Sequence, residues 1–196
     1  MSPHRTDPQL LWRSPLAALT TLAMLASSFV SPATAVKLSD GRTYFENPPR
    51  LEKASVSQNA AYASSIYSFI LTIPEKAGEP LGSVLIKPEP SPDYPRFDLS
   101  DISVFEGTSR RRRPNQFAFQ VTESEKEPRT ITLQFDPPIP PGRTITIDIR
   151  AFYNPGASGV YLYGVTAFPP GEKPYGQFLG FGRIHIYSVF DGSFFP

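Results

Sequence analysis

Histidine, cysteine and closely spaced carboxylates are the residues by which a sequence most often signals chemistry, and this sequence has few of them. It contains no cysteine and two histidines, His4 and His185. A nucleophilic site needs a base within reach of a serine or cysteine. A zinc or copper site needs several nitrogen or sulfur ligands. We therefore assign no catalytic residue and expect no metal and no cofactor. His185 belongs to an alternating run, Arg183 to Tyr187, and we expect it to face solvent.

Carboxylates leave two further kinds of chemistry to consider. The best candidate for a calcium loop is Asp93 to Asp101, which lacks the glycine turn and the dense acidic spacing of such loops. A glycoside hydrolase needs two acids that face each other across a cleft, and Glu106, Asp148 and Glu172 are available for that role. A carboxylate-based hydrolase that acts on envelope polysaccharide is thus an alternative function.

The densest group of aromatic residues lies between Gly159 and Tyr187, where glycines and prolines separate the rings. We predict an aromatic loop from Phe168 to Phe181 between two strands. Its rings would stack on a partner and its polar residues would donate or accept hydrogen bonds. The candidate binding residues are Phe168, Glu172, Lys173, Tyr175, Gln177, Phe178 and Phe181. In the alternative interpretation, the same rings fold back and plug one end of the fold.

A second candidate site is the run of basic residues Arg110, Arg111, Arg112 and Arg113. Such a loop could hold an anion, and the alternative is a solvated loop with no ligand. The chain as a whole has a formal net charge of +1, so no strong field draws it to nucleic acid or to an anionic membrane. We expect no nucleic-acid partner.

The first 35 residues have the pattern of a cleavable export signal. Arg5 and Arg13 precede an uncharged apolar run, Leu16 to Val30, and Ala33-Thr34-Ala35 supplies the small residues for cleavage after Ala35. The run is shorter than the roughly 20 residues that a membrane-spanning helix needs. We expect an exported mature chain without a membrane span. An uncleaved amino-terminal anchor is the alternative.

The elements that would position these residues are short strands. Apolar and polar residues alternate with period two, most clearly over residues 130–135 and 144–150, and proline- and glycine-rich turns separate the runs. This pattern is typical of antiparallel strands with one buried face. We predict an all-β, immunoglobulin-like sandwich of about eight to ten strands over residues 36–187, then a tail over 188–196. A small β-barrel is the alternative.

Three segments resemble an exported cyanobacterial family known as domain of unknown function 2808. They are Pro48 to Leu51, the turn FDPPIPPG over Phe135 to Gly142, and above all GVYLYGVTAFPPGEKPYGQFLGFGRIHIY over Gly159 to Tyr187. The resemblance covers about Val36 to Tyr187. It implies a small secreted or periplasmic protein, or one of the thylakoid lumen, and no assigned activity.

We therefore expect a non-enzymatic exported protein that binds a protein partner or a cell-envelope glycan. A purely structural envelope component is a further alternative. The first expectation requires that the rings of the aromatic loop are exposed in the folded chain.

Overall fold

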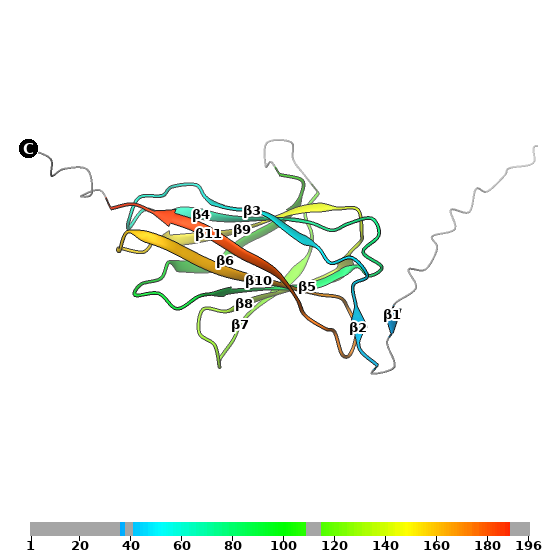
Figure 1. The fold of residues 1–196 in the computed structure, drawn as a ribbon. Coiled ribbons are helices and arrows are strands. Elements are labelled where there is room, and N and C mark those ends of the chain that lie inside the picture. The colour runs from blue at the N-terminus through cyan, green and yellow to red at the C-terminus, as the bar shows by residue number, and fades with distance from the viewer. Residues whose placement is uncertain (1–35, 38–40, 109–114, 189–196) are drawn as a thin grey trace, which may run out of the picture. The chain divides into compact units, whose positions relative to one another are not determined.

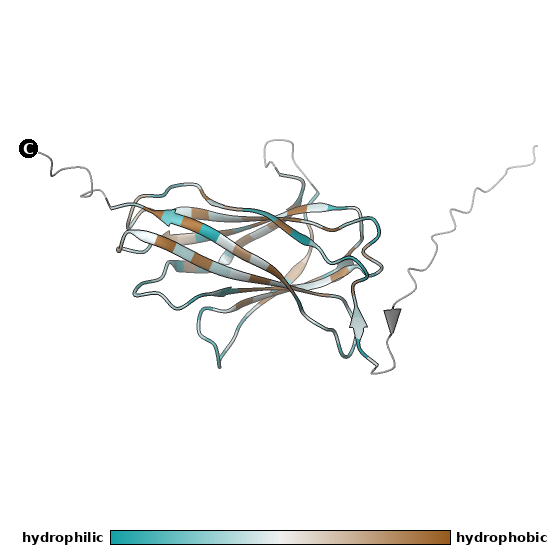
Figure 2. Cartoon of the chain, viewed as in Figure 1, coloured by the Kyte–Doolittle hydropathy of each residue, from teal (hydrophilic) through white to brown (hydrophobic). Residues whose placement is uncertain are grey.

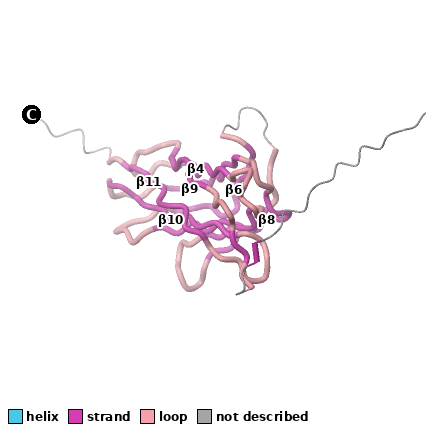
Figure 3. Tube along the Cα trace, turned by 45° about the vertical axis from the view of Figure 1, so that its right-hand side comes forward, coloured by secondary structure: helices cyan, strands magenta, loops and turns pink. Residues whose placement is uncertain are grey.

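The computed structural model describes residues 36–37, 41–108 and 115–188. The predicted signal, the four arginines of residues 110–113 and the tail beyond Ser188 lie outside the described residues. By its contacts the chain divides into two units, and all the described residues belong to the second, residues 33–196. Its described part is built of strands and loops alone, without a helix, as Figure 3 shows.

The strands form two larger antiparallel sheets and one small one. The five-stranded sheet has the order β11-β10-β5-β8-β7, the four-stranded sheet β3-β4-β9-β6, and a two-stranded sheet pairs β1 with β2 (Figure 1). The strand bounds are β1 Val36–Lys37, β2 Thr43–Tyr44, β3 Arg50–Val56, β4 Ser65–Thr72, β5 Leu81–Pro88, β6 Arg96–Glu106, β7 Phe119–Glu123, β8 Ile131–Ile139, β9 Thr144–Tyr153, β10 Gly159–Phe168 and β11 Gln177–Ile186. The prediction of an all-β sandwich is confirmed, and the barrel alternative is wrong.

The core lies between the two larger sheets and follows from the alternation in the sequence. Along β4, residues 131–135 of β8, residues 145–151 of β9 and residues 161–167 of β10, every second residue points inward and is buried. Hydrophobic and hydrophilic bands accordingly alternate along the strands in Figure 2. The inward residues include Tyr67, Phe69, Leu71, Leu133, Phe135, Ile145, Ile147, Ile149, Tyr163 and Val165. Each fully buried side chain of this kind contributes about 1.5–3 kcal/mol to stability.

On one side, the sandwich is closed where edge strand β11 approaches edge strand β3. The contact has room for no more than a glycine on β11. A Cβ added at Gly182 would lie 2.7 Å from the Cβ of Ala54 and 3.1 Å from Cε1 of Phe69. A glycine inside a strand often marks such a close approach, and here it lets an edge strand of one sheet pack on the other sheet.

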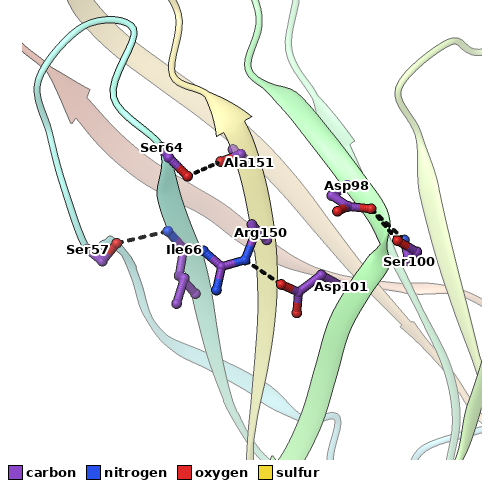
Figure 4. A network of polar contacts seen from close by, with 8 residues as sticks. All are labelled: Ser57, Ser64, Ile66, Asp98, Ser100, Asp101, Arg150 and Ala151. Atoms are coloured by element: carbon purple, nitrogen blue, oxygen red, sulfur yellow. Dashed lines mark hydrogen bonds and ion pairs between the residues drawn. The ribbon is translucent and has the colours of Figure 1, made fainter.

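The four-stranded sheet carries polar contacts on its surface. Figure 4 shows Arg150 of β9 donating from Nε to the carboxylate of Asp101 on β6, and Asp98 accepting from the side chain of Ser100 at 2.6 Å. The first contact links the neighbouring strands β9 and β6, and the second lies within β6. The surface of β10 and β11 is different, and it holds most of the predicted binding residues.

Candidate functional site

Two exposed phenylalanine rings stand together on the outer face of β11. Phe178 is 57% exposed and Phe181 48% exposed. Their ring centroids lie 5.0 Å apart and the ring planes meet at 69°, an edge-to-face pair. Edge-to-face contact suits the charge distribution of aromatic rings, which are negative on the face and positive at the edge.

The prediction that these two residues belong to a loop is wrong. β11 begins at Gln177, so the loop is confined to residues 169–176. β11 contains a bulge. Val165 of β10 pairs with Gly180 but Thr166 pairs with Phe178, so the register shifts between them, and Gly180 has φ +116°. The bulge places Phe178 and Phe181 on the same face of the sheet. A backbone in this conformation favours glycine.

Gly164 of β10 lies beneath the two rings, and sequence reasoning did not single it out. It pairs with Phe181, and an added Cβ would lie 3.3 Å from Cε2 of Phe178 and 3.6 Å from Cε1 of Phe181. The two rings therefore lie over the backbone of β10 and do not extend straight into solvent. The signal that could have revealed this role was a lone glycine in a strand pattern.

The ring pair is part of a larger surface, here called the aromatic face, which consists of Val160, Leu162, Phe178 and Phe181. Val160 is exposed and Leu162 half-buried, and both alternate with buried tyrosines of β10. Arg183 pairs with Leu162 and His185 pairs with Val160 across the strands, so both basic side chains share this face.

Arg183 makes no ion pair within the described residues. His185 is exposed, as predicted, and its ring stacks with that of Tyr187 at 6.5 Å and 17°. One end of the aromatic face is thus basic, and its arginine is available to an acidic group.

Three other predicted residues gather around β2 instead. Tyr175, 43% exposed, lies 4.7 Å from the ring of Tyr44 at an angle of 30°. The backbone of the 169–176 loop is tied to β2, because Tyr175 N donates to Thr43 O at 3.0 Å and Thr43 N to Lys173 O at 3.2 Å. Glu172 and Lys173 are exposed and line a pocket of about 380 Å³.

The last two predicted residues are less accessible. Phe168 is half-buried and packs against the loop: a Cβ at Gly176 would lie 2.4 Å from Cε1 of Phe168. The Oε1 atom of Gln177 is buried and accepts no hydrogen bond from the residues that the structure describes. The structure therefore divides the predicted site. Phe178 and Phe181 stand on the sheet, and Glu172, Lys173 and Tyr175 lie at β2. Phe168 packs against the 169–176 loop, and Gln177 pairs with the buried Ala167.

Two of the acidic residues considered in the sequence, Asp93 and Glu106, each have hydrogen-bond partners of their own. Asp93 accepts hydrogen bonds from the backbone N–H groups of Gly156 (2.6 Å) and Tyr94 (2.7 Å), and these bonds, the one from Gly156 first, lower the pKa of its carboxyl. Glu106 accepts from Asn115 and Arg143, which likewise lower its pKa.

Four surface pockets of the described part are each lined by at most one acidic residue. A paired-carboxylate cleft is therefore not formed in them. Within the same part of the chain, no group of three or more histidine, aspartate and glutamate side chains is placed to hold a metal ion. A search of the described residues for a helix long and apolar enough to cross a membrane also finds none.

Comparison with known proteins finds a matching family model. A family model described as "Protein of unknown function (DUF2808)" matches residues 42–186. No curated protein matches the sequence.

Three solved structures illustrate the similarity in fold. A collagen-binding domain from a Staphylococcus aureus adhesin has 10% identity and a TM-score of 0.38, covering 68% of this chain and 94% of that one. An uncharacterized Nocardia farcinica protein with an immunoglobulin-like fold has 13% identity and a TM-score of 0.39, covering 68% and 96%. The carboxy-terminal domain of the Streptococcus agalactiae polypeptide BspA has 11% identity and a TM-score of 0.38, covering 79% and 49%.

Proposed function

The chain belongs to the DUF2808 family of unknown function, and we propose that it is an exported, non-enzymatic binding module that holds a protein partner on its aromatic face. The observation that carries the proposal is the exposed Phe178–Phe181 pair. Exposing a cluster of aromatic rings to water is unfavourable in free energy, and covering them in a complex recovers that free energy.

Export is supported by the sequence of residues 1–35, with its basic start, apolar run and small residues before position 36. Cleavage after Ala35 would leave β1, which begins at Val36, complete. The absence of cysteine is compatible with an oxidising compartment, because no thiol is open to oxidation. We place the mature protein in the periplasm or outside the cell, with the thylakoid lumen as the alternative for a photosynthetic source.

The geometry of the rings favours a protein over a glycan as the partner. A sugar ring stacks on a flat aromatic surface, whereas Phe178 and Phe181 meet at 69° and carry no hydrogen-bonding group. An angled pair of this kind accommodates an apolar side chain between and beside the rings. Arg183, at the edge of the face, would pair with a carboxylate of the partner and orient it.

Site-specific photo-cross-linking in the native host tests this proposal. A photoreactive phenylalanine analogue replaces Phe178, and in the control it replaces Lys53, which is exposed on β3 of the other sheet. We expect a discrete cross-linked protein from position 178 and none from position 53. Equal products from both positions, or none from either, would contradict the proposal.

The double variant Phe178→Ala/Phe181→Ala extends the test to affinity for the partner so identified. Removing a central aromatic contact typically costs about 1–2 kcal/mol, so we expect binding to weaken about tenfold or more per ring, with Lys53→Ala as the control. If an envelope polysaccharide binds the native protein and not the double variant, the partner of the aromatic face is a glycan and not a protein. Polysaccharide cleavage by the purified protein would favour the hydrolase, and a chain without any partner would favour a structural component.

A further inference from the structure

A small pocket lies at the side of the sandwich opposite the aromatic face. The five-stranded sheet has β11 at one edge and β7 at the other, and β6 is an edge strand of the four-stranded sheet. The pocket opens between the β6 edge and the β7–β8 edge and has a volume of about 200 Å³. Its lining residues are Pro95, Arg96, Phe97, Leu99, Glu123, Arg129 and Ile131.

The floor of the pocket is apolar and firmly packed. Phe97 meets the ring of Tyr67 edge-to-face at 5.1 Å and 89°, and Tyr67 is fully buried in the core. Ile131 is also buried. Because these side chains belong to the core, the pocket keeps its shape without a ligand. An apolar group that enters it would leave water for a preformed hydrophobic wall.

Two arginines, Arg96 and Arg129, line the pocket, and the guanidinium of each lies over an aromatic ring. The Cζ atom of Arg129 lies 4.3 Å from the ring centre of Tyr94, and that of Arg96 lies 5.8 Å from the ring centre of Phe152. Neither arginine makes an ion pair with any residue that the structure describes. Each is therefore fixed by a cation–π contact while its hydrogen-bond donors stay available.

The backbone at Arg129 is in a conformation that non-glycine residues seldom adopt. Its φ is +66°, in the left-handed region, and its N–H donates to Oε1 of Glu123 at 2.8 Å. Such backbone conformations are unfavourable in free energy and are frequent at functional sites. Here the bond to Glu123 fixes the turn that presents the side chain of Arg129 at the pocket.

We propose that this pocket binds a carboxylate attached to an apolar group about as large as one amino-acid side chain. Its volume is several times the roughly 30 Å³ of a water molecule and smaller than the roughly 300 Å³ or more of pockets for drug-sized ligands. The apolar group would lie on Phe97, Leu99 and Ile131, and the carboxylate would bind the two arginines, since guanidinium and carboxylate match in geometry.

Two acids nearby set the balance of charge. Glu123 lines the pocket, so its negative charge opposes an anionic ligand. Asp93 lies close enough to Arg129 for that charge to help lower the pKa of Asp93, but its oxygens already accept backbone N–H groups of Gly156 and Tyr94. Neutralising Glu123 should therefore strengthen binding, and removing either arginine should weaken it.

The test is a titration of the purified mature protein, followed by isothermal calorimetry and by amide NMR shifts, with N-acetyl-phenylalanine and its carboxamide as probes. We expect the acid to bind, with shifts confined to residues around the pocket, and the amide to bind about tenfold more weakly or not at all. Equal binding of acid and amide, or no binding of the acid at millimolar concentration, would overturn the proposal.

Substitutions assign the effect to the pocket. Arg96→Gln and Arg129→Gln should each weaken binding of the acid about tenfold, whereas Arg183→Gln on β11, an arginine remote from the pocket, should leave it unchanged. Arg129→Gly suits the left-handed backbone, so it removes the guanidinium without added strain. Glu123→Gln still accepts the N–H of Arg129 and should tighten binding. Weaker binding in Glu123→Gln, or an effect of Arg183→Gln as large as that of Arg96→Gln, would refute the assignment.

The source of the carboxylate is tested with a pentapeptide that ends in phenylalanine. Tighter binding than N-acetyl-phenylalanine supports the carboxy terminus of a polypeptide as the natural ligand, and weaker binding supports a free small acid. The proposal is independent of the aromatic face. The variant Phe178→Ala/Phe181→Ala should bind the acid normally, so failure of one proposal leaves the other standing.

Discussion

Replacement of Gly182 by alanine would test how the sandwich closes along β3 and β11. The added Cβ would lie 2.7 Å from the Cβ of Ala54 and 3.1 Å from Cε1 of Phe69. Neither atom ends a long flexible side chain, so the strands themselves have to move apart. Overpacking of this kind typically costs about 1–3 kcal/mol, and we expect Gly182→Ala to lose that much stability.

The structure also indicates which second substitution should rescue the first. Ala54→Gly by itself should cost about 1–2 kcal/mol, from the flexibility of glycine in a strand and the loss of one buried methyl group. In the double variant the contact with position 54 disappears and only that with Phe69 remains. The double variant should therefore be about 1–2 kcal/mol more stable than the sum of the single effects implies.

Chemical unfolding of the mature protein provides the measurement. The single tryptophan of the chain is Trp12, in the predicted signal, so unfolding is best followed by circular dichroism and tyrosine fluorescence. Gly164→Ala is the matched control: its Cβ would meet the ring of Phe178 at 3.3 Å, and an exposed ring can turn aside. Additive effects of Gly182→Ala and Ala54→Gly, or equal losses in Gly182→Ala and Gly164→Ala, would refute the packing argument.

Two further predictions concern polar groups. Asn154 is buried, accepts a hydrogen bond from the hydroxyl of Tyr67 at 2.9 Å and donates two to backbone carbonyls at 2.8 Å. Asn154→Ala removes the acceptor of the buried Tyr67 hydroxyl and one of the donors to each carbonyl; Gln58 O keeps the bond from Ser65 Oγ and Ala60 O that from Ala63 N. It should cost about 1–3 kcal/mol, seen as a melting temperature lower by roughly 2–12 °C; an unchanged value would mean that water replaces the amide. Asp93 has a pKa below its ordinary 3.8 in the folded chain, chiefly through the N–H of Gly156. Its contribution to stability is present above about pH 4 and is lost as the pH falls through the lower folded-state pKa. Unfolding midpoints of Asp93→Asn should fall less steeply with acid than those of the native protein, and parallel profiles would contradict this.

The strands of this fold could be predicted from local alternation, but their arrangement could not. Residues 131–135 and 145–149 have their apolar side chains inward, as their pattern indicates. Yet β8 and β9, though consecutive, belong to different sheets and face each other across the core. A period of two identifies the buried face of a strand. It carries no information on whether the next strand lies beside it or opposite.

The candidate sites show the same division between local and long-range information. The sequence left open whether the aromatic rings are exposed, as binding requires, or plug one end of the fold; Tyr175, Phe178 and Phe181 are exposed, whereas Phe168 is half-buried. The bulge at Gly180 places Phe178 and Phe181 on the sheet, and backbone hydrogen bonds to β2 hold Tyr175 at that strand. Both features depend on pairing between segments that are distant in the sequence. The small pocket could not be predicted, because its residues come from segments far apart in the sequence.

The two proposed sites lie at opposite edges of the five-stranded sheet for a reason inherent in the fold. In the middle strands, β5 and β8, inward side chains fill the core and outward ones are flanked by neighbouring strands on both sides. Edge strands have one free side, so rings and guanidinium groups there can lie over the backbone or across the gap between the sheets. Coupling between distant sites requires an element with two alternative arrangements, and between these two edges lies a packed core of buried side chains. The two proposed sites, one for a protein on β10–β11 and one for a small acid at β6–β8, should therefore be occupied independently of each other.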